Sequence, residues 1–310
     1  MERKINILLF YKFQKIGNPK SFAKEHLKFC KKLEVLGKVL VSEEGINGSI
    51  SGTVEQTEKY KKFLKSKKGF EDIWFKEEMS NEHPFTRMFV RVKKEIIALD
   101  KPINLNKIGK HLSPKEFLEL YKKNEDVIIL DARNDYESKV GKFKNAITPQ
   151  IKTFREFPKA VEEMKNMKNK KIVMYCTGGI RCEKASAYMI QKGFKNVMQL
   201  KGGIINFCQQ YPDTVWEGRC FVFDKRLMTN INQTSPPISE CELCGKLCDL
   251  YRNCKNHNCD KLVIMCLNCE KKMNACCSKK CLQEFREHCM GKSSMKQNRR
   301  METPQDIIIN

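Results

Sequence analysis

An apolar strand, a short glycine-containing loop and a helix follow one another at residues 170–191, KKIVMYCTGGIRCEKASAYMIQ. Cys176 opens the loop, two adjacent glycines follow it, and Arg181 stands at the start of the helix. A thiolate is stabilised at a helix N-terminus beside a cation, and glycines let backbone N–H groups converge on an anion. We therefore predict that Cys176 is a nucleophilic thiolate and that Arg181 supplies fixed positive charge. The expected anion cradle consists of Thr177, Gly178, Gly179 and Ile180.

Other residues near this loop have simpler explanations. Free cysteines are often buried and inert, which is the alternative for Cys176 itself. Cys182 stands at the start of the helix, where it is either a resolving thiol or part of the core. Asp131 and Arg133 follow an apolar strand, and we expect them to form a structural ion pair.

The length of the loop indicates a class of site. Cys-x4-Arg is one residue shorter than the phosphatase Cys-x5-Arg loop and resembles the rhodanese, or sulfurtransferase, loop. Three flanking segments also have rhodanese-like patterns: VIILDARNDYE at 127–137, VGKFKNAI at 140–147 and QLKGGIINF at 199–207. Lys142 replaces the histidine, and Phe207 the tryptophan, of many rhodaneses. Both substitutions are expected to affect packing more than chemistry.

Residues 1–103 alternate strand and helix patterns, with amphipathic helices ending at Gly37 and Gly69. The order β-α-β-β-α-β predicts a ferredoxin-like, or acylphosphatase-like, α+β domain. The segment EGINGSISG is interpreted as a hairpin turn that needs Gly45 and Gly48, with substrate contact as the alternative.

A polar linker is expected at 104–111, followed by a central domain at 112–225. Ser113 is the natural N-cap of its first helix, with Pro114 at the first helical position. Strands and helices then alternate, which predicts a parallel sheet with Cys176 at the carboxyl end of its strand, where such sheets bind ligands. No histidine occurs between 112 and 225, so a Cys-His hydrolase centre within this domain is excluded.

The region 226–290 is rich in closely paired cysteines, and 291–310 is expected to be a disordered tail. The four pairs are Cys241 and Cys244, Cys254 and Cys259, Cys266 and Cys269, and Cys277 and Cys281. Eight thiolates make two tetrahedral sites, and zinc is the usual ion for such sites. About two structural zinc ions are therefore predicted, with iron–sulfur ligation as the alternative. Cys248 is a surplus cysteine and the alternative to a neighbouring ligand, and the spacing leaves open which pairs share a site.

The net charge of +22 makes an acidic polymer a plausible partner, although a lysine bias from an AT-rich genome gives the same charge. The apolar stretch INILLFY is too short to span a membrane. Eleven of the sixteen cysteines crowd into residues 241–289, where eight of them form metal-type pairs, and this fits a reducing cytoplasm.

EGINGSISG, YCTGGIRCEKAS, CDLYRNCKN and CCSKKC together resemble the rhodanese-domain tRNA uridine(34) hydroxylase family, in its longer, cysteine-rich branch. The resemblance implies oxygen-dependent conversion of uridine 34, in the anticodon loop of tRNA, to 5-hydroxyuridine. It also implies that Cys176 is the active-site cysteine and a carrier of a cysteine persulfide intermediate. The electron donor is not implied.

The residues alone do not explain how oxygen is activated. No flavin or nicotinamide fingerprint is recognised, and the five histidines have no facial-triad spacing. A persulfide sulfurtransferase is the first alternative function and uses the same residues. A non-catalytic RNA-binding protein is the second, and the presence of Cys176 disfavours it.

Overall fold

The computed structural model describes residues 4–123, 125–232, 235–259 and 261–289, so the tail expected at 291–310 lies outside the described residues. The chain divides after Pro236 into two units, and each is described by itself. Both expected α/β domains lie in the first unit. None of the helices in these ranges combines the length and the apolar character needed to cross a bilayer.

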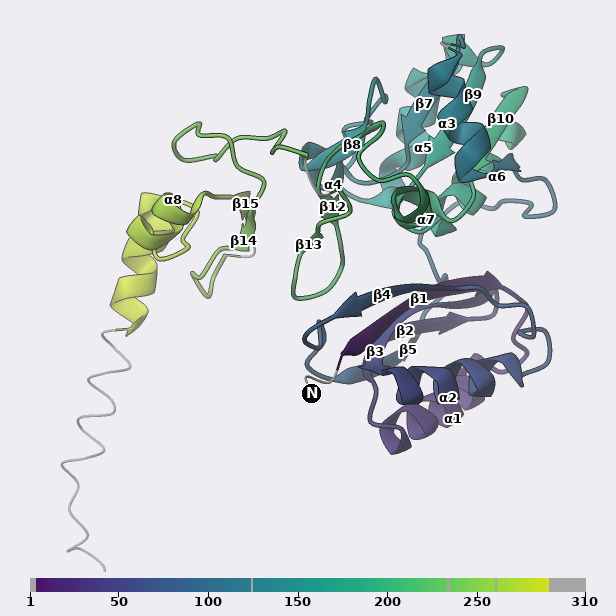
Figure 1. The fold of residues 1–310 in the computed structure, drawn as a ribbon, viewed down its shortest axis with the longest axis horizontal. Helices are drawn as coiled ribbons and strands as arrows, with labels where there is room; N and C mark the ends of the chain where they lie inside the picture. Colours follow the sequence, from purple (N-terminus) through teal and green to yellow (C-terminus); the bar gives the residue numbers. More distant parts are fainter. Residues whose placement is uncertain (1–3, 124, 233–234, 260, 290–310) are drawn as a thin grey trace, which may run out of the picture. The chain divides into compact units, whose positions relative to one another are not determined.

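The first domain is a five-stranded sheet with two helices on one face (Figure 1). The strand order is β4-β1-β3-β2-β5, and all neighbours are antiparallel except β2 and β5. Its elements are β1 (Ile5–Phe13), α1 (Pro19–Lys32), β2 (Leu36–Ser42), β3 (Gly45–Thr53), α2 (Val54–Lys65), β4 (Phe75–Ser80) and β5 (Met88–Val92). The expected acylphosphatase-like fold is confirmed, with β5 as an added edge strand.

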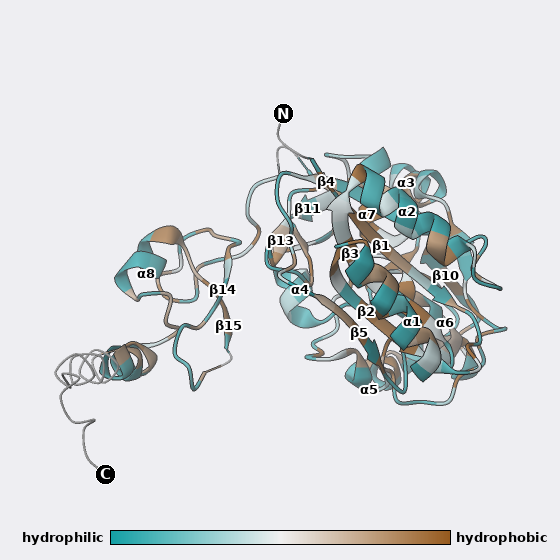
Figure 2. Cartoon of the chain, turned by 90° about the horizontal axis from the view of Figure 1, so that it is seen from below, coloured by the Kyte–Doolittle hydropathy of each residue, from teal (hydrophilic) through white to brown (hydrophobic). Residues whose placement is uncertain are grey.

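The alternation of side chains along β1 gives the sheet two different faces. Leu8 and Phe10 are fully buried in the cluster that also contains Tyr60 of α2. Leu9 and Tyr11 point to the opposite face, because successive side chains of a strand alternate. In Figure 2 the strands of this sheet carry many hydrophobic residues, whereas α1 and α2 are largely hydrophilic. The face without helices is thus available to the second domain.

Two glycines expected at a helix end and in a hairpin turn lie inside strands instead. α1 ends at Lys32, and Gly37 belongs to β2, where a Cβ would lie 2.3 Å from the Ser49 carbonyl oxygen. Gly45 opens β3 with φ +148°, and its Cβ would lie 2.0 Å from the Lys12 carbonyl oxygen. The hairpin turn precedes Gly45. These glycines therefore serve close approach between strands, as does Gly48 against Phe10.

The second domain contains a parallel sheet in the order β6-β10-β9-β7, with helices on both faces. Its main elements are β6 (Lys110–Leu112), α3 (Pro114–Lys122), β7 (Ile128–Asp131), α4 (Asp135–Lys139), β8 (Gly141–Phe143), α5 (Phe157–Glu163), β9 (Lys171–Tyr175), α6 (Ile180–Gln191), β10 (Asn196–Leu200) and α7 (Gly203–Gln210). Two 3-10 turns flank α5, at Phe154–Glu156 and Lys165–Met167. The short strands β11 (Trp216–Gly218), β12 (Cys220–Phe221) and β13 (Met228–Thr229) follow.

The expected linker is shorter than the sequence suggested. Lys110 and His111 belong to β6, because they pair with Met198 and Gln199 of β10. The expected N-cap is present: the Ser113 hydroxyl accepts from the Glu116 backbone N–H, and Glu116 completes a capping box. The central domain therefore includes His111, which the sequence analysis had assigned to the linker.

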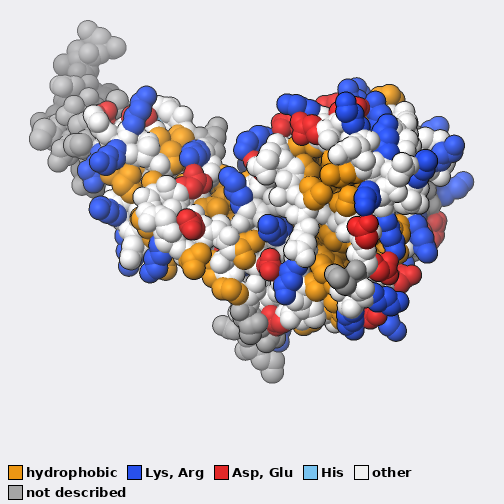
Figure 3. Space-filling model, turned by 90° about the horizontal axis from the view of Figure 1, so that it is seen from above, with side chains coloured by type: hydrophobic (Ala, Val, Ile, Leu, Met, Phe, Trp, Pro, Cys, Tyr) orange, Lys and Arg blue, Asp and Glu red, His pale blue; other side chains and the backbone are white. Residues whose placement is uncertain are grey.

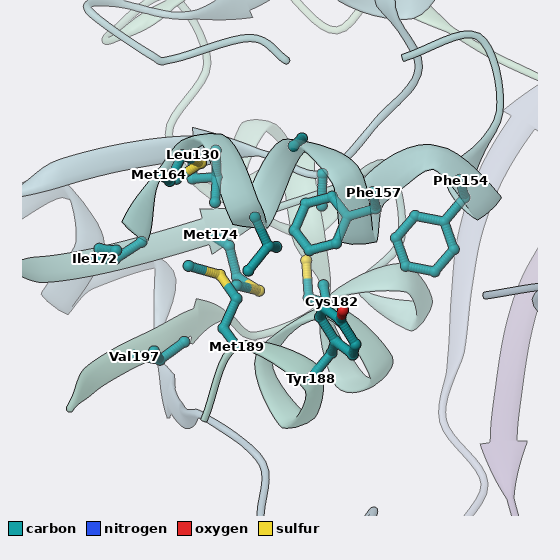
Figure 4. Packing of buried hydrophobic residues seen from close by; sticks show 14 of the residues in the cluster. Leu130, Phe154, Phe157, Met164, Ile172, Met174, Cys182, Tyr188, Met189 and Val197 are labelled. Atoms are coloured by element: carbon teal, nitrogen blue, oxygen red, sulfur yellow. The ribbon is translucent and has the colours of Figure 1, made fainter. Parts of the chain in front are cut away.

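The sheet buries a separate core on each face. Ile172 and Met174 of β9 join the cluster under α5 and α6, which Figure 4 shows with Phe157 and Cys182. Val173 and Tyr175 point to the other face, toward α3 and α7. Phe207 is fully buried there, 5.4 Å from the Phe117 ring by centroids. Phe207, which replaces the tryptophan of many rhodaneses, therefore packs in this core.

The second unit has few regular elements. They are β14 (Tyr251–Asn253), β15 (Leu262–Ile264) and α8 (Leu267–Lys272), and residues 279–289 are helical. β14 and β15 form an antiparallel pair. With so little regular structure, the unit depends on other cross-links for its stability.

Candidate active site and cysteine clusters

Cys176 directly follows the carboxyl end of β9, and residues 177–179 separate it from the start of α6. The Gly179 backbone N–H donates to Cys176 Sγ at 3.1 Å. Gly179 has φ +103°, a conformation that other residues rarely adopt, and this brings its N–H toward the sulfur. Of the two glycines expected to form the anion cradle, Gly179 therefore donates its backbone N–H to the thiol.

Several groups stabilise Cys176 as a thiolate. Burial alone would raise the pKa of Cys176. The hydrogen bond from the Cys182 thiol, the charge of Arg181 and the backbone N–H groups of both residues outweigh it, and the pKa falls to about 6. Burial and the hydrogen bond to Cys176 raise the pKa of Cys182 well above its ordinary value. Cys182 is thus a protonated donor as well as a core residue, with no exposed surface.

Arg181 is held by a carboxylate that sequence reasoning missed. Glu137, in α4, pairs with both ends of the guanidinium: Arg181 Nη1 lies 2.5 Å from Oε2, and Nη2 lies 2.8 Å from Oε1. Nη2 also donates to the Thr177 hydroxyl at 3.2 Å. Both charged side chains are buried. Glu137 is the last residue of the motif DARNDYE. Because a buried arginine needs an acidic partner, this acid close to the predicted site could have been identified from the sequence.

Asp131 and Arg133 form the ion pair expected at the end of β7. Arg133 Nη2 lies 2.7 Å from Asp131 Oδ2, and both side chains have no exposed surface. Arg133 Nη2 also donates to the Gly141 carbonyl at 2.6 Å. The Trp216 ring lies under the guanidinium at 5.3 Å. These contacts tie β7 to β8 and the segment after α7, which is a structural role.

The first domain covers the loop. A Cβ at Gly178 would lie 2.9 Å from Leu9 Cδ2, and one at Gly179 would lie 2.9 Å from the Tyr11 hydroxyl. The glycines therefore allow β1 to approach as well as orienting N–H groups. Cys176 has no exposed surface in this arrangement. Leu9 and Tyr11 are more than a hundred residues away in sequence, and no local pattern indicated their role.

Charged groups fix the two domains of the first unit together. Lys184 of α6 pairs with Glu44 at 2.8 Å and with Glu95 at 2.6 Å. The Tyr11 hydroxyl donates to Glu183 Oε1 at 3.0 Å, and His111 Nε2 lies 3.1 Å from the same oxygen. The histidine at the edge of the domain therefore contacts Glu183 and not the thiol.

The eight paired cysteines come together as two separate groups of four, and within each group the sulfur atoms lie within 4.8 Å of one another. The groups are Cys241, Cys244, Cys266 and Cys269, and Cys254, Cys259, Cys277 and Cys281. The first and third pairs share one group, and the second and fourth pairs share the other. The structure thus shows which cysteine pairs share a group, which their spacing in the sequence left open.

The sulfur separations fit a bound metal. Zn–S bonds of about 2.3 Å in a tetrahedron put the sulfurs about 3.8 Å apart, whereas a disulfide needs about 2.05 Å. Cys244 and Cys266 Sγ are 3.8 Å apart, as are those of Cys259 and Cys277. Cys248 is buried outside both groups, so each group has four ligands without it.

The fold and site define a multidomain rhodanese-type protein with two cysteine centres suited to metal. Family models match along most of the chain: a UPF0176 acylphosphatase like domain at 5–96, a rhodanese-like domain at 113–210 and a rhodanase C-terminal region at 217–282. The chain belongs to the family of proteins named tRNA uridine(34) hydroxylase, which confirms the resemblance stated above.

Relatives of that name match over nearly their whole length. The Bacillus velezensis protein is 43% identical over 305 residues, covering 96% of this chain and 94% of its own. The Cytophaga hutchinsonii protein is 41% identical, covering 89% of each chain. The Streptococcus sanguinis protein is 40% identical, covering 96% of this chain and 94% of its own.

The pKa of Cys176 gives a testable pH dependence. The ultraviolet absorbance of the Cys176 thiolate, taken as the difference between the wild type and Cys176→Ser, should rise with pH about a midpoint near 6, because the thiolate fraction grows as pH passes the pKa. Cys182→Ala should move the midpoint upward, since it removes a donor to the thiolate. Cys208→Ala removes a buried thiol on the other face of the sheet and serves as the control. A wild-type midpoint at about pH 8.5, the value of an ordinary thiol, would contradict this assignment.

Proposed function

We propose that this chain converts uridine 34 of tRNA to 5-hydroxyuridine with molecular oxygen, using Cys176 as the nucleophile. The observation that carries the proposal is the Cys176 thiolate, with its pKa of about 6, in the loop that the first domain covers. Relatives named tRNA uridine(34) hydroxylase support the substrate and the hydroxylation. A reduced thiolate fits a reaction in the cytoplasm, where thiols stay reduced.

The charge of the chain supports an RNA substrate. The net charge is +22, and Figure 3 shows Lys and Arg side chains spread over the face in view. Neutralising phosphates with such side chains gives affinity that falls as salt rises. Bases of an anticodon loop are single-stranded, so they can be splayed out at a low unstacking cost. The wobble uridine meets this requirement.

A thiolate activates uracil by adding to it. Cys176 Sγ bonds to C6, and the electron pair of the C5–C6 double bond moves to C5. C5 then bonds to O2, giving a hydroperoxide after protonation. An external thiol reductant, the class of electron donor we assign, cleaves the O–O bond to leave a hydroxyl on C5 and release water, and becomes a disulfide. Loss of the C5 proton then expels Cys176 from C6 and restores the ring.

Persulfide sulfur transfer is the second candidate function, because the Cys-x4-Arg loop is shared with sulfurtransferases. One observation disfavours an anionic sulfur donor such as thiosulfate. Arg181 is already paired with Glu137 through both ends of its guanidinium, so its charge is not free to bind a second anion. The Gly179 N–H contact at 3.1 Å is compatible with a persulfide on Cys176.

The activity is tested in cells. Total tRNA from cells lacking the gene should lose 5-hydroxyuridine derivatives at position 34, as measured by mass spectrometry of nucleosides. The wild-type gene and Cys208→Ala should restore them, and Cys176→Ser should not, because a serine hydroxyl is not ionised at neutral pH. Unchanged 5-hydroxyuridine in the deletion strain, with sulfur transfer from thiosulfate by the purified protein, would favour the sulfurtransferase.

The bond from Cys176 to C6 is tested with a modified substrate. An anticodon stem-loop with 5-fluorouridine at position 34 should remain bonded to Cys176 in air, because C5 then has no proton whose loss could expel Cys176 from C6, and loss of fluoride would leave a C5 ketone that is still bonded at C6. The Cys176 peptide should then carry the mass of a nucleotide. The stem-loop with ordinary uridine, and the Cys176→Ala protein, are the controls that should give no adduct. An active enzyme that forms no adduct would rule out addition at C6.

We propose zinc as the metal of both cysteine groups, because four thiolates in a closed tetrahedral set are typical of structural zinc. Elemental analysis of protein purified without chelator should give about two zinc ions per chain. Chelation should unfold the unit that follows Pro236 and leave the first unit folded, as followed by proteolysis. Cys248→Ser should keep both metals, whereas Cys244→Ser should lose metal. Iron with visible charge-transfer bands would show that the sites hold another metal.

A further inference from the structure

A pocket beside the Cys176 loop lies between the two domains of the first unit. Its volume is about 400 Å³, and strands β1 and β4 of the first domain line one side. His111, Glu183 and Lys201 of the second domain line the other. Gly202 lines the pocket and also lies beside the loop, because its Cα is 3.6 Å from where a Cβ added at Gly179 would lie. The proposed reaction does not yet assign any function to this pocket.

Lys76 is a buried cation without a polar partner. Only 4% of Lys76 is exposed, and among the described residues its side chain has neither an ion pair nor a hydrogen bond. It lies 4.3 Å from the Trp74 ring centroid and 5.1 Å from that of Tyr11, and all three residues line the pocket. Burying an ammonium without an acceptor is costly. The arrangement therefore suits a ligand oxygen that takes up the Lys76 donors.

Trp74 offers an aromatic surface at the same place. Its side chain is 43% exposed, although tryptophan usually buries most of its surface. The indole packs against Gly202, where a Cβ would lie 2.5 Å from Trp74 Cη2 and 2.8 Å from Trp74 Cζ3. The ring is thus held in place at the pocket wall with part of its surface open to a ligand. An exposed, positioned ring is what base stacking needs.

The remaining charges favour an anion over a cation. Lys201 is exposed and has no ion-pair partner in the part of the chain that the structure describes. Of the two acids that line the pocket, Asp72 pairs with Lys12, and Glu183 accepts from Tyr11 and Gln199. Both carboxylates are therefore already satisfied. Lys76 and Lys201 are left for the ligand.

We propose that this pocket binds one unstacked nucleotide of single-stranded RNA, with its base against the part of Trp74 that Lys76 does not cover and a sugar–phosphate oxygen accepting from Lys76. Lys201 contacts the phosphate. The inference rests on the proposed function, because it assigns part of the RNA substrate to the neighbourhood of Cys176. It adds a specific recognition site in the first domain, which had no residue assigned to binding.

The test uses the fluorescence of Trp74 in the full-length protein. The chain has two tryptophans, and Trp216 is only 2% exposed, so Trp74 dominates the response to a bound base. Oligouridylate of six residues should quench the emission, and an abasic oligomer of equal charge should not. UMP is the third probe, which separates a free nucleotide from RNA: it should bind more weakly than the oligomer.

Variants then assign the contacts. Trp74→Ala should weaken oligouridylate binding about 5- to 150-fold, measured by anisotropy of a labelled oligomer, and Trp74→Phe should retain most of the affinity. Lys76→Met should also weaken binding, whereas Lys24→Met, an exposed lysine on α1, is the charge-matched control. Circular dichroism and thermal unfolding check that each variant is folded.

The outcomes separate this inference from the proposed function. Cys176→Ala should bind oligouridylate like the wild type even though it is inactive. Equal quenching by abasic and base-containing oligomers, or full affinity in folded Trp74→Ala, would overturn the pocket assignment, whatever the activity toward tRNA. If the protein does not form 5-hydroxyuridine but its fluorescence is still quenched only by base-containing oligomers, the proposed hydroxylation is wrong and the pocket assignment stands.

Discussion

The buried ion pair between Arg181 and Glu137 is the interaction on which the site depends. It joins α4 to the start of α6, and both side chains are almost wholly removed from water. Removing one partner of such a pair typically costs about 3–5 kcal/mol, because the other charge is left buried. The pair therefore fixes the loop that contains Cys176. The Arg181 guanidinium therefore acts on the Cys176 thiolate from a fixed position and does not move to bind a ligand.

The second requirement of the site is that the first domain covers the loop that contains Cys176. Leu9 and Tyr11 lie against the two loop glycines, so the first domain excludes water from the thiolate. Low-dielectric surroundings strengthen the hydrogen bonds and charges that act on Cys176. In the proposed reaction the same cover limits access, since a base would have to reach a sulfur atom with no exposed surface. Substrate entry in that reaction involves the contact between the two domains as well as the RNA.

The sequence predicted those features that depend on neighbours along the chain. The Ser113 cap, the strand before Cys176 and the position of Arg181 at the helix start follow from local patterns. Gly37 and Gly45 were misassigned, because the backbone oxygens that they approach belong to other strands. Lys76 and Trp74 were missed for the same reason: their relation to the loop exists only after both domains have folded. Spacing identified the cysteine pairs but contained no information about which pairs share a site.

The alternating order of the cysteine pairs has a consequence for how the second unit would bind two metal ions. The segment closed by the first group, from Cys241 to Cys269, contains Cys254 and Cys259, which belong to the second group. Binding one ion therefore shortens the loop that the other must close, and loop closure costs less entropy for a shorter loop. The two ions should help each other to bind. Each loop shortens by less than half, so this coupling is smaller than about 0.6 kcal/mol, and the singly loaded form should remain populated when metal is limiting.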